Sequence, residues 1–144
     1  MARLKLSLPG KFIYSTEIPL RITDINYGGH LGNDAVLSVV HEARVRFLKE
    51  YGFSELEVGD AGIIMSDAVI IFSAEAFYGD VLEVKVTASE LGNISCDFFY
   101  QLINKKSGTE IARAKTGIVF FDYEKRRPVK IPEVFLSTIG KLIQ

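Results

Sequence analysis

One change of periodicity constrains this chain more than any other feature of its sequence. In a single segment, apolar residues recur every three or four positions, at Val36, Val40, Ala43, Phe47 and Tyr51. This spacing places side chains on one stripe of an α-helix. Elsewhere apolar and polar residues alternate with a period of two, which is typical of strands with one buried face. The sequence therefore predicts one long helix in a chain otherwise made of strands.

The strand segments are joined mainly by short turns, and this fixes the expected fold class. The alternation runs through residues 12–22, 68–76, 82–88, 94–102 and 112–120. Short turns join antiparallel neighbours, and one long helix against such a sheet defines an α+β domain. We expect a single domain over residues 1–144, with an antiparallel sheet of about five strands and a short helix after Pro132.

Composition excludes several classes of function and favours the cytoplasm. The 17 basic and 18 acidic residues give a net charge of -1, which argues against a nucleic-acid binder. Cys96 is the one cysteine, so no internal disulfide can form, as in a reducing cytosol. The longest apolar run, VIIFSA from Val69, is far shorter than the ~20 residues of a membrane helix. A cytoplasmic protein that spans no membrane is expected.

The segment TDINYGGHLGND, residues 23–34, is too polar for a buried strand and too rich in glycine for a helix. It leads into the predicted helix, whose start Asn33 or Asp34 can cap. A helix N-terminus attracts oxyanions, and Asp24, Asn26 and His30 add polar side chains there. The loop could polarise a carbonyl and activate a water. Turn geometry alone also explains such a composition.

The residues from this loop to the end of the helix carry a family resemblance. DINYGGHLGNDAVLSVVHEARVRFLKEYGF resembles the signature of hotdog-fold acyl-CoA thioesterases of the 4-hydroxybenzoyl-CoA thioesterase type. Similarity continues through YGDVLEVKVTASELGNISCDFFYQLIN, GTEIARAKTGIVFFD and RRPVKIP. The positions that match the signature are Asp24, Asn26, Gly29, His30, Leu31, Asn33, Glu42, Ala43, Arg44, Phe47 and Leu48.

The resemblance implies a fold, an assembly and a reaction. It implies a hotdog fold, in which an antiparallel sheet wraps one long central helix, and subunits that pair edge to edge into dimers, often within tetramers. It implies hydrolysis of an acyl-CoA thioester at the subunit interface, with coenzyme A along the surface. The Asn33 amide would bond the thioester oxygen. Lys125 and Arg127, in the basic run EKRRP, would bind coenzyme A phosphates, although such runs are often only solvated turns.

The sequence departs from the family pattern at Asn26, where the second carboxylate of the signature is expected. A carboxamide is neither a useful base nor a nucleophile near neutral pH. It can hold a water or a carbonyl, and another group must then take the proton. Asp24 would share a face with Asn26 on an extended segment. Histidine is the residue type suited to proton transfer near neutral pH, so Asp24 and His30 are both candidates for the base.

Four further residues have less specific interpretations. Glu42 lies at i,i+4 from Arg46, and a surface ion pair explains it better than catalysis. His41 is expected to be exposed, and Cys96 to be a small core residue. Asp67 interrupts an apolar run and indicates either a bulge or an acid facing the site. Two histidines and one cysteine provide no zinc-ligand spacing, so no metal is expected.

Hydrolysis of an acyl-CoA is the leading hypothesis, and coenzyme A enters only as part of the substrate, without a separate cofactor. One alternative is a hydratase or dehydratase of acyl thioesters. Gly29 and His30 fit it and Glu42 follows, but the prolines of such enzymes are absent between them. Another alternative is a non-catalytic module that binds acyl thioesters, which Asn26 favours.

Overall fold

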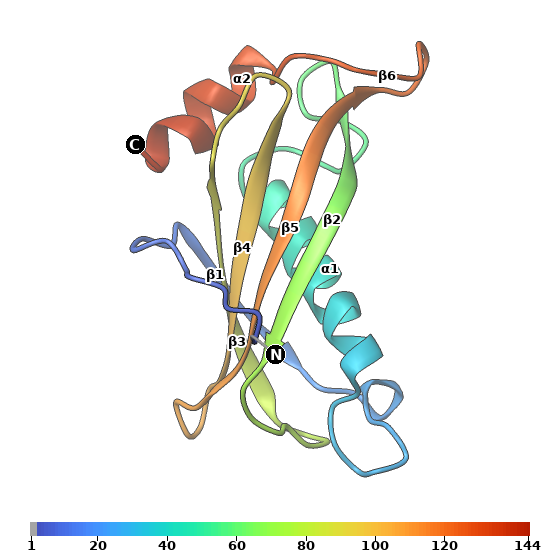
Figure 1. Ribbon diagram of the computed structural model, residues 1–144, viewed down its shortest axis with the longest axis vertical. Helices are drawn as coiled ribbons and strands as arrows, with labels where there is room; N and C mark the ends of the chain where they lie inside the picture. Colours follow the sequence, from blue (N-terminus) through green and yellow to red (C-terminus); the bar gives the residue numbers. More distant parts are fainter. Residues whose placement is uncertain (1–2) are drawn as a thin grey trace.

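The computed structural model of this protein describes residues 3–144 and confirms the α+β class (Figure 1). Residues 1 and 2, part of the predicted 1–144 domain, lie outside the described residues, and the single domain stays a prediction. The elements in chain order are β1 (Tyr14–Pro19), the 3₁₀ helix η1 (Ile22–Asp24), α1 (Asn33–Glu50), β2 (Gly62–Phe72), β3 (Val81–Ser89), β4 (Ser95–Asn104), β5 (Glu110–Asp122), β6 (Arg127–Pro128), α2 (Glu133–Phe135) and the π-helical turn η2 (Leu136–Gly140).

The described strands form one antiparallel sheet of six strands. The order is β1-β3-β4-β5-β2, and β6 pairs with β5. The sequence predicted about five strands and missed β6, because two residues are too short to show an alternation. The edges of the long strands are β1 and β2, and α1 lies along one face of the sheet (Figure 1).

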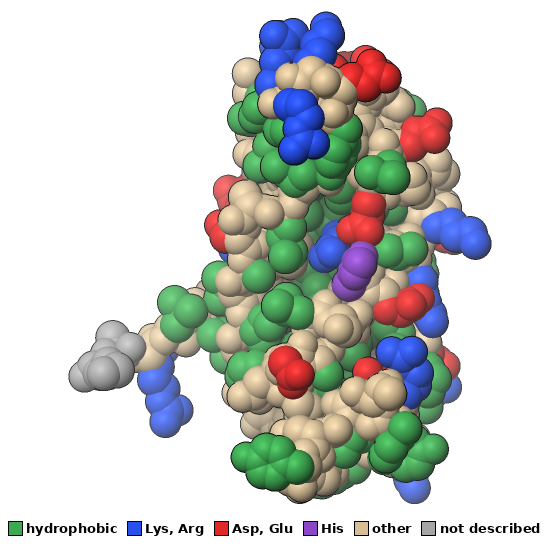
Figure 2. All heavy atoms as spheres, turned by 90° about the vertical axis from the view of Figure 1, so that its right-hand side faces the viewer, with side chains coloured by type: hydrophobic (Ala, Val, Ile, Leu, Met, Phe, Trp, Pro, Cys, Tyr) green, Lys and Arg blue, Asp and Glu red, His purple; other side chains and the backbone are tan. Residues whose placement is uncertain are grey.

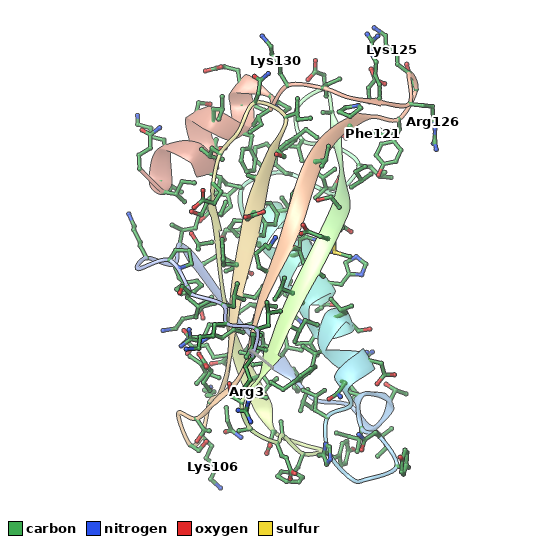
Figure 3. All side chains as sticks on the ribbon, viewed as in Figure 1. Arg3, Lys106, Phe121, Lys125, Arg126 and Lys130 are labelled. Atoms are coloured by element: carbon green, nitrogen blue, oxygen red, sulfur yellow. The ribbon has the colours of Figure 1, made fainter. Side chains whose placement is uncertain are left out.

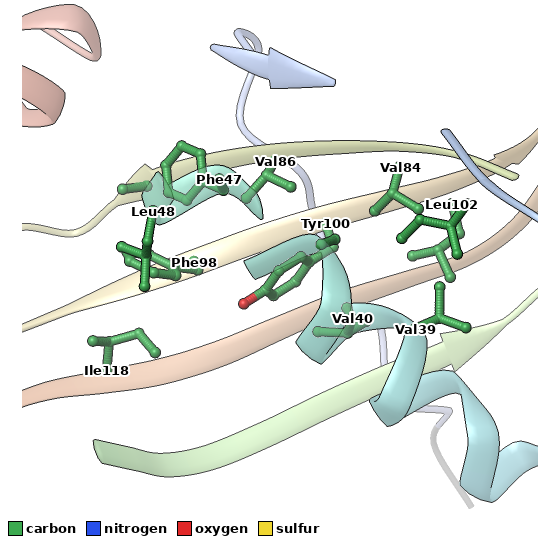
Figure 4. Close-up of a cluster of buried hydrophobic side chains, with 14 of the residues drawn as sticks. Val39, Val40, Phe47, Leu48, Val84, Val86, Phe98, Tyr100, Leu102 and Ile118 are labelled. Carbon is green, nitrogen blue, oxygen red and sulfur yellow. The ribbon is translucent and has the colours of Figure 1, made fainter. Parts of the chain in front are cut away.

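The core lies between α1 and the sheet, as the helix stripe predicted. Val36, Val40, Ala43 and Phe47 are all buried on α1. They face inward-pointing residues of β3, β4 and β5, and Figure 4 shows Phe47 and Val40 among these strands. The Phe47 ring meets the Phe98 ring edge to face at a centroid distance of 5.3 Å. Burial of this stripe, at about 25 cal/mol per Å² of apolar surface, holds the long helix on the sheet.

The two ends of α1 differ in how well the sequence predicted them. At the C-terminal end Gly52 has a φ of 84°, which confirms the left-handed glycine. At the N-terminal end the predicted cap is wrong, because α1 begins at Asn33 and the cap residue is Gly32. Gly32 has no side chain, so no side chain caps α1. The first-turn amides therefore keep their partial positive charge.

A polar network fastens α1 to the sheet through Arg44, which is buried on the helix. Its Nε donates to Glu55 at 2.9 Å, and its Nη1 donates to the Tyr100 hydroxyl at 3.4 Å. Tyr100 also shares a 2.8 Å hydrogen bond with Thr116 on β5. Burial raises the pKa of Tyr100, so the hydroxyl stays protonated. The pattern analysis assigned Arg44 no such role.

Strand β2 departs most from prediction. Ala68, Ile70 and Phe72 were predicted to share a buried face with Ala74 and Ala76, but only Ala76 is buried. β2 is the edge of the sheet. Ile63 at its start is buried, whereas Phe72 at its end is 49% exposed. Figure 2 shows hydrophobic side chains along the side of the molecule that carries α1 and β2.

Asp67 marks a bulge in β2, one of its two predicted roles. The pairing of β2 with β5 shifts register between Met65 and Asp67. Asp67 Oδ1 accepts hydrogen bonds from Lys115 Nζ at 3.0 Å and from the Gly117 amide at 2.9 Å. A side chain at Gly117 would collide with this carboxylate, because its Cβ would lie 2.5 Å from Asp67 Oδ1. Glycine at 117 and the acid at 67 therefore form the bulge together.

Two further sequence predictions concern the core and the membrane. Cys96 is 2% exposed, and burial raises the pKa of its thiol. This confirms that Cys96 is a core residue. Among residues 3–144, no helix has the length and apolar character needed to cross a bilayer.

Candidate active site

The loop between η1 and α1 is folded around Asn26. Asn26 Oδ1 accepts hydrogen bonds from the amides of Gly28 at 2.9 Å and His30 at 3.4 Å. The backbone amide of Asn26 donates to the His30 carbonyl at 2.9 Å. Gly29 provides the positive φ of 86° that closes the turn. The side-chain oxygen of Asn26 thus shapes the loop.

The loop is also fastened to the segment that follows β2. The Leu31 amide donates to the Ala76 carbonyl at 2.7 Å, and the Gly32 amide donates to the Asp24 carbonyl at 3.1 Å. Leu31 and Ala76 are both buried. The two segments lie at the same end of the molecule as the start of α1 (Figure 1). This contact sets the distance between the loop and the β2–β3 connection.

A groove of about 270 Å³ opens between these segments. One wall comes from the loop and the first turn of α1, and the other from the end of β2, the residues after it and the start of β5. The groove is lined by His30, Leu31, Asn33, Val36, Phe72, Ser73, Ala74, Glu75 and Ile111. Apolar and polar side chains thus face one space, which suits an apolar group with a polar reactive end.

The imidazole of His30 lines this groove, and one of its ring nitrogens has a hydrogen-bond partner. Its Nδ1 lies 3.3 Å from the Leu31 carbonyl oxygen. A carbonyl only accepts hydrogen bonds, so this contact puts the proton of the neutral ring on Nδ1. Nε2 then carries the lone pair and can accept a proton from a water.

Asn33 stands beside His30 as the first residue of α1. Its side chain is exposed and lines the same groove. The carboxamide can donate to a carbonyl oxygen, and the uncapped amides of the first helical turn add positive potential. Asn33 and the helix start together can stabilise negative charge on a substrate oxygen.

Asp24 lies elsewhere. Its carboxylate belongs to η1 and is almost fully buried, with Oδ2 accepting from the Arg21 amide at 2.8 Å. The Arg21 guanidinium lies 3.6 Å from Oδ1. Asp24 lines a second groove of about 230 Å³, shared with Glu42 and Arg46. The structure brings His30 and Asn33 together in one groove, and the Asp24 carboxylate lies outside that groove.

The interpretations of Glu42 and His41 are confirmed. Arg46 Nε donates to Glu42 at 2.8 Å, which is the predicted i,i+4 pair. The His41 side chain is 57% exposed, and its Nε2 lies 2.9 Å from a Glu55 oxygen. Neither residue lines the groove that contains His30.

Lys125 and Arg127 lie at the other end of the long axis. Figure 3 labels Lys125 at the end opposite the η1–α1 loop, and both side chains are exposed. Asp122 Oδ1 accepts from the Lys125 amide at 3.0 Å and so closes the turn. Within one chain, these two basic residues cannot contact a ligand that is bound only in the groove of His30.

Glu75 is the groove residue that sequence reasoning missed. It lines the groove with His30 and Asn33. In the sequence it is the one charged residue in the stretch AVIIFSAEAFYG that begins at Ala68. A lone acid just before a glycine turn was the signal that could have identified it. Among residues 3–144, no group of three or more His, Cys, Asp or Glu side chains could hold a metal ion.

Comparison with known proteins identifies the class that this fold and groove define. The chain belongs to the thioesterase-like superfamily, whose family model matches residues 20–139. The match contains the η1–α1 loop, α1 and the long strands β2 to β5. It confirms the family resemblance drawn from the sequence.

Particular relatives agree with this class. The chain is 28% identical over 138 residues to the 1,4-dihydroxy-2-naphthoyl-CoA hydrolase of Synechocystis sp., covering 92% of this chain and 97% of that protein. The crystal structure of a 1,4-dihydroxy-2-naphthoyl-CoA thioesterase from Synechocystis superposes with a TM-score of 0.81 at 25% identity, covering 91% of this chain and 98% of the other. A thioesterase-superfamily protein from Jannaschia sp. has the same fold, with a TM-score of 0.81 at 14% identity and coverage of 94% and 86%.

Proposed function

We propose that this protein is an acyl-CoA thioesterase that hydrolyses its substrate in the groove of His30 and Asn33. The observation that carries the proposal is the juxtaposition in that groove of the His30 imidazole and the Asn33 carboxamide, which stands at an uncapped helix start. The apolar wall beside them suits an acyl group. Membership of the thioesterase-like superfamily supports the same reaction.

The proposed reaction uses a water and two groups of this chain. His30 Nε2 takes a proton from the water as its oxygen bonds to the thioester carbon. The carbonyl electrons move to oxygen, where the Asn33 amide and the first turn of α1 stabilise the charge. The intermediate then collapses, the C–S bond breaks, and the imidazolium returns the proton to sulfur. The products are a free acid and coenzyme A, which enters as part of the substrate.

The acyl group is proposed to be compact and aromatic. The Synechocystis relative is a 1,4-dihydroxy-2-naphthoyl-CoA hydrolase, and the half-exposed Phe72 ring lines the groove. A flat acyl group could stack on this ring.

A panel of acyl-CoAs tests the function. The assay follows coenzyme A release with a thiol reagent for 1,4-dihydroxy-2-naphthoyl-CoA, benzoyl-CoA, acetyl-CoA and palmitoyl-CoA. We expect the aromatic thioesters to have the highest kcat/KM. Saturable binding without thiol release would indicate a non-catalytic module. An altered acyl chain that stays on coenzyme A would indicate a hydratase or dehydratase.

We expect the protein to be a homodimer or a tetramer built from dimers, in the hotdog arrangement with α1 wrapped by the sheet. β2 is an exposed apolar edge, and such edges are usually paired or blocked. Light scattering at micromolar concentration should give at least twice the monomer mass of 16.0 kDa. A monomer would contradict both this assembly and a site shared between subunits.

The proposed assembly would bring the basic turn of one chain, which contains Lys125 and Arg127, close to the groove of another. β2 starts near the end of the molecule that carries Lys125 and ends beside the groove (Figures 1 and 3). In an antiparallel pair of β2 strands, the start of one strand lies beside the end of the other. The basic turn of a second copy would then approach the groove of the first, where it could bind coenzyme A phosphates.

Replacing both Lys125 and Arg127 with Ala is expected to raise KM for acyl-CoA roughly tenfold at low salt, since two exposed ion pairs contribute up to about 1 kcal/mol each. The effect should shrink at high salt because exposed charges are screened, and kcat should hardly change. The control is Lys49→Ala with Lys141→Ala, which removes the same charge from other exposed positions. An unchanged KM at low salt would mean that the run is only a solvated turn.

A further inference from the structure

The groove contains a carboxylate, although it does not come from the loop where the signature of the family would provide one. At the signature position stands Asn26, whose side-chain oxygen holds the loop. Asp24 is buried and lines a different groove. Among the residues that line the groove of His30, Glu75 is the one with a carboxylate.

The backbone that follows Glu75 is fixed by hydrogen bonds. The next residue, Ala76, is fully buried, and its carbonyl accepts the 2.7 Å hydrogen bond from the Leu31 amide. Further on, Asp80 Oδ2 accepts from the Phe77 amide at 2.8 Å. Leu31 directly follows His30 in the chain, and Ala76 directly follows Glu75. The Leu31–Ala76 hydrogen bond therefore holds the segments of His30 and Glu75 next to each other. Glu75 itself is exposed, which leaves its carboxylate accessible to a water or a substrate.

We infer that Glu75 is a catalytic residue that orients the attacking water and faces the imidazole of His30 across the groove. This inference rests on the proposed thioesterase function and deepens it. The ionised carboxylate accepts one hydrogen bond from the water, while His30 Nε2 takes the other proton of that water. Glu75 keeps its charge throughout, and the returning proton still passes from His30 to sulfur.

The charge on Glu75 has a second effect, because a carboxylate stabilises a nearby imidazolium. Proton transfer from water creates this imidazolium at the same time as the oxyanion, and Glu75 offsets part of its energetic cost. The carboxylate thus replaces the acid missing at position 26 from the opposite wall of the groove.

Other charged groups on the elements around His30 are differently engaged. Asp24 in η1 is held by Arg21, and Asp80 accepts from a backbone amide. Asp34 is exposed in the first turn of α1 and does not line the groove. Glu75 is therefore the carboxylate whose removal should change the surroundings of the His30 ring most.

The first test needs no substrate. The chain has two histidines, so NMR at one fixed pH can follow both rings and assign them with a His41→Ala variant. In Glu75→Gln the ring resonances of His30 should shift, because the carboxylate that faces the ring is replaced by a neutral amide. Glu75→Asp should give resonances close to those of the wild type. Glu133→Gln, an exposed change on α2, should leave them unchanged, and His41 is the internal reference.

The second test measures the reaction. Glu75→Gln should lower kcat/KM roughly 10²-fold, at the lower limit for loss of a general acid–base group. Glu75→Asp should recover part of the rate. Glu133→Gln should match the wild type.

The outcomes separate the two proposals. If the wild type hydrolyses acyl-CoA and Glu75→Gln keeps its rate, or if the His30 ring resonances do not change, the role of Glu75 is refuted and the proposed function stands. If the wild type releases no coenzyme A from any substrate, the proposed function fails. The NMR measurement then still decides whether Glu75 faces His30.

Discussion

Replacing His30 with Ala is expected to slow thioester hydrolysis roughly 10²–10⁴-fold, as loss of a general base does. The ring lines the groove, and its Nδ1 contact with the Leu31 carbonyl leaves Nε2 free. Asp24→Asn should change the rate little. The Asp24 carboxylate is buried against Arg21 in another groove, and an asparagine oxygen can still accept from the Arg21 amide.

The measurement is kcat/KM for the best acyl-CoA across pH, with the melting temperature of each variant as the check on folding. A loss confined to His30→Ala assigns the proton transfer to the imidazole. A comparable loss in a folded Asp24→Asn protein would instead assign it to the carboxylate. If both variants retain the wild-type rate, the chemistry lies outside this loop.

The largest expected change in stability comes from Phe47→Ala, which should lower the free energy of unfolding by about 3–5 kcal/mol. Phe47 is fully buried on α1. Its ring lies 5.8, 5.5 and 5.3 Å from the ring centroids of Tyr14, Tyr51 and Phe98. Truncation leaves a cavity where β1, α1 and β4 meet, and these elements cannot all move to fill it.

Val45→Ala is the matched control for this change. Val45 lies two residues earlier on the same helix and is 41% exposed, so its truncation should change stability by only about 0.5 kcal/mol. Both variants are unfolded by denaturant at one protein concentration, because assembly would make stability concentration-dependent. Equal losses in the two variants would contradict a core centred on Phe47.

The fold was predictable where burial follows the local pattern. Leu82, Val84 and Val86 alternate with polar residues, and all three are fully buried under α1. The same rule failed for β2, because alternation shows that a strand has an apolar face but not whether another element covers it. Ala68 and Phe72 belong to an edge strand, and no element within residues 3–144 buries them.

The site was only partly predictable from the loop. His30 and Asn33 were expected together, since both stand at the start of a helix, and they share one groove. Asp24 and Asn26 were expected on one face of an extended segment. Instead, Asp24 ends the 3₁₀ helix η1, which turns its carboxylate toward Arg21. Local hydrogen bonds between neighbours decided this, and periodicity does not report them.

Glu75 could not be inferred from the loop, because it lies more than 40 positions further along the chain. The Leu31–Ala76 hydrogen bond brings the two segments together. A contact of this kind depends on the path of β2 across the sheet. The course of β2 across the sheet cannot be predicted from one sequence segment at a time.

The bulge at Asp67 has a consequence for how newly made chains meet other proteins. An unpaired strand containing VIIF can join many exposed edges and start aggregation. The shift in register between Met65 and Asp67 gives the β2 edge an irregular outline, which a straight strand cannot match along its whole length. The bulge therefore makes β2 a poorer template for a straight strand of another protein.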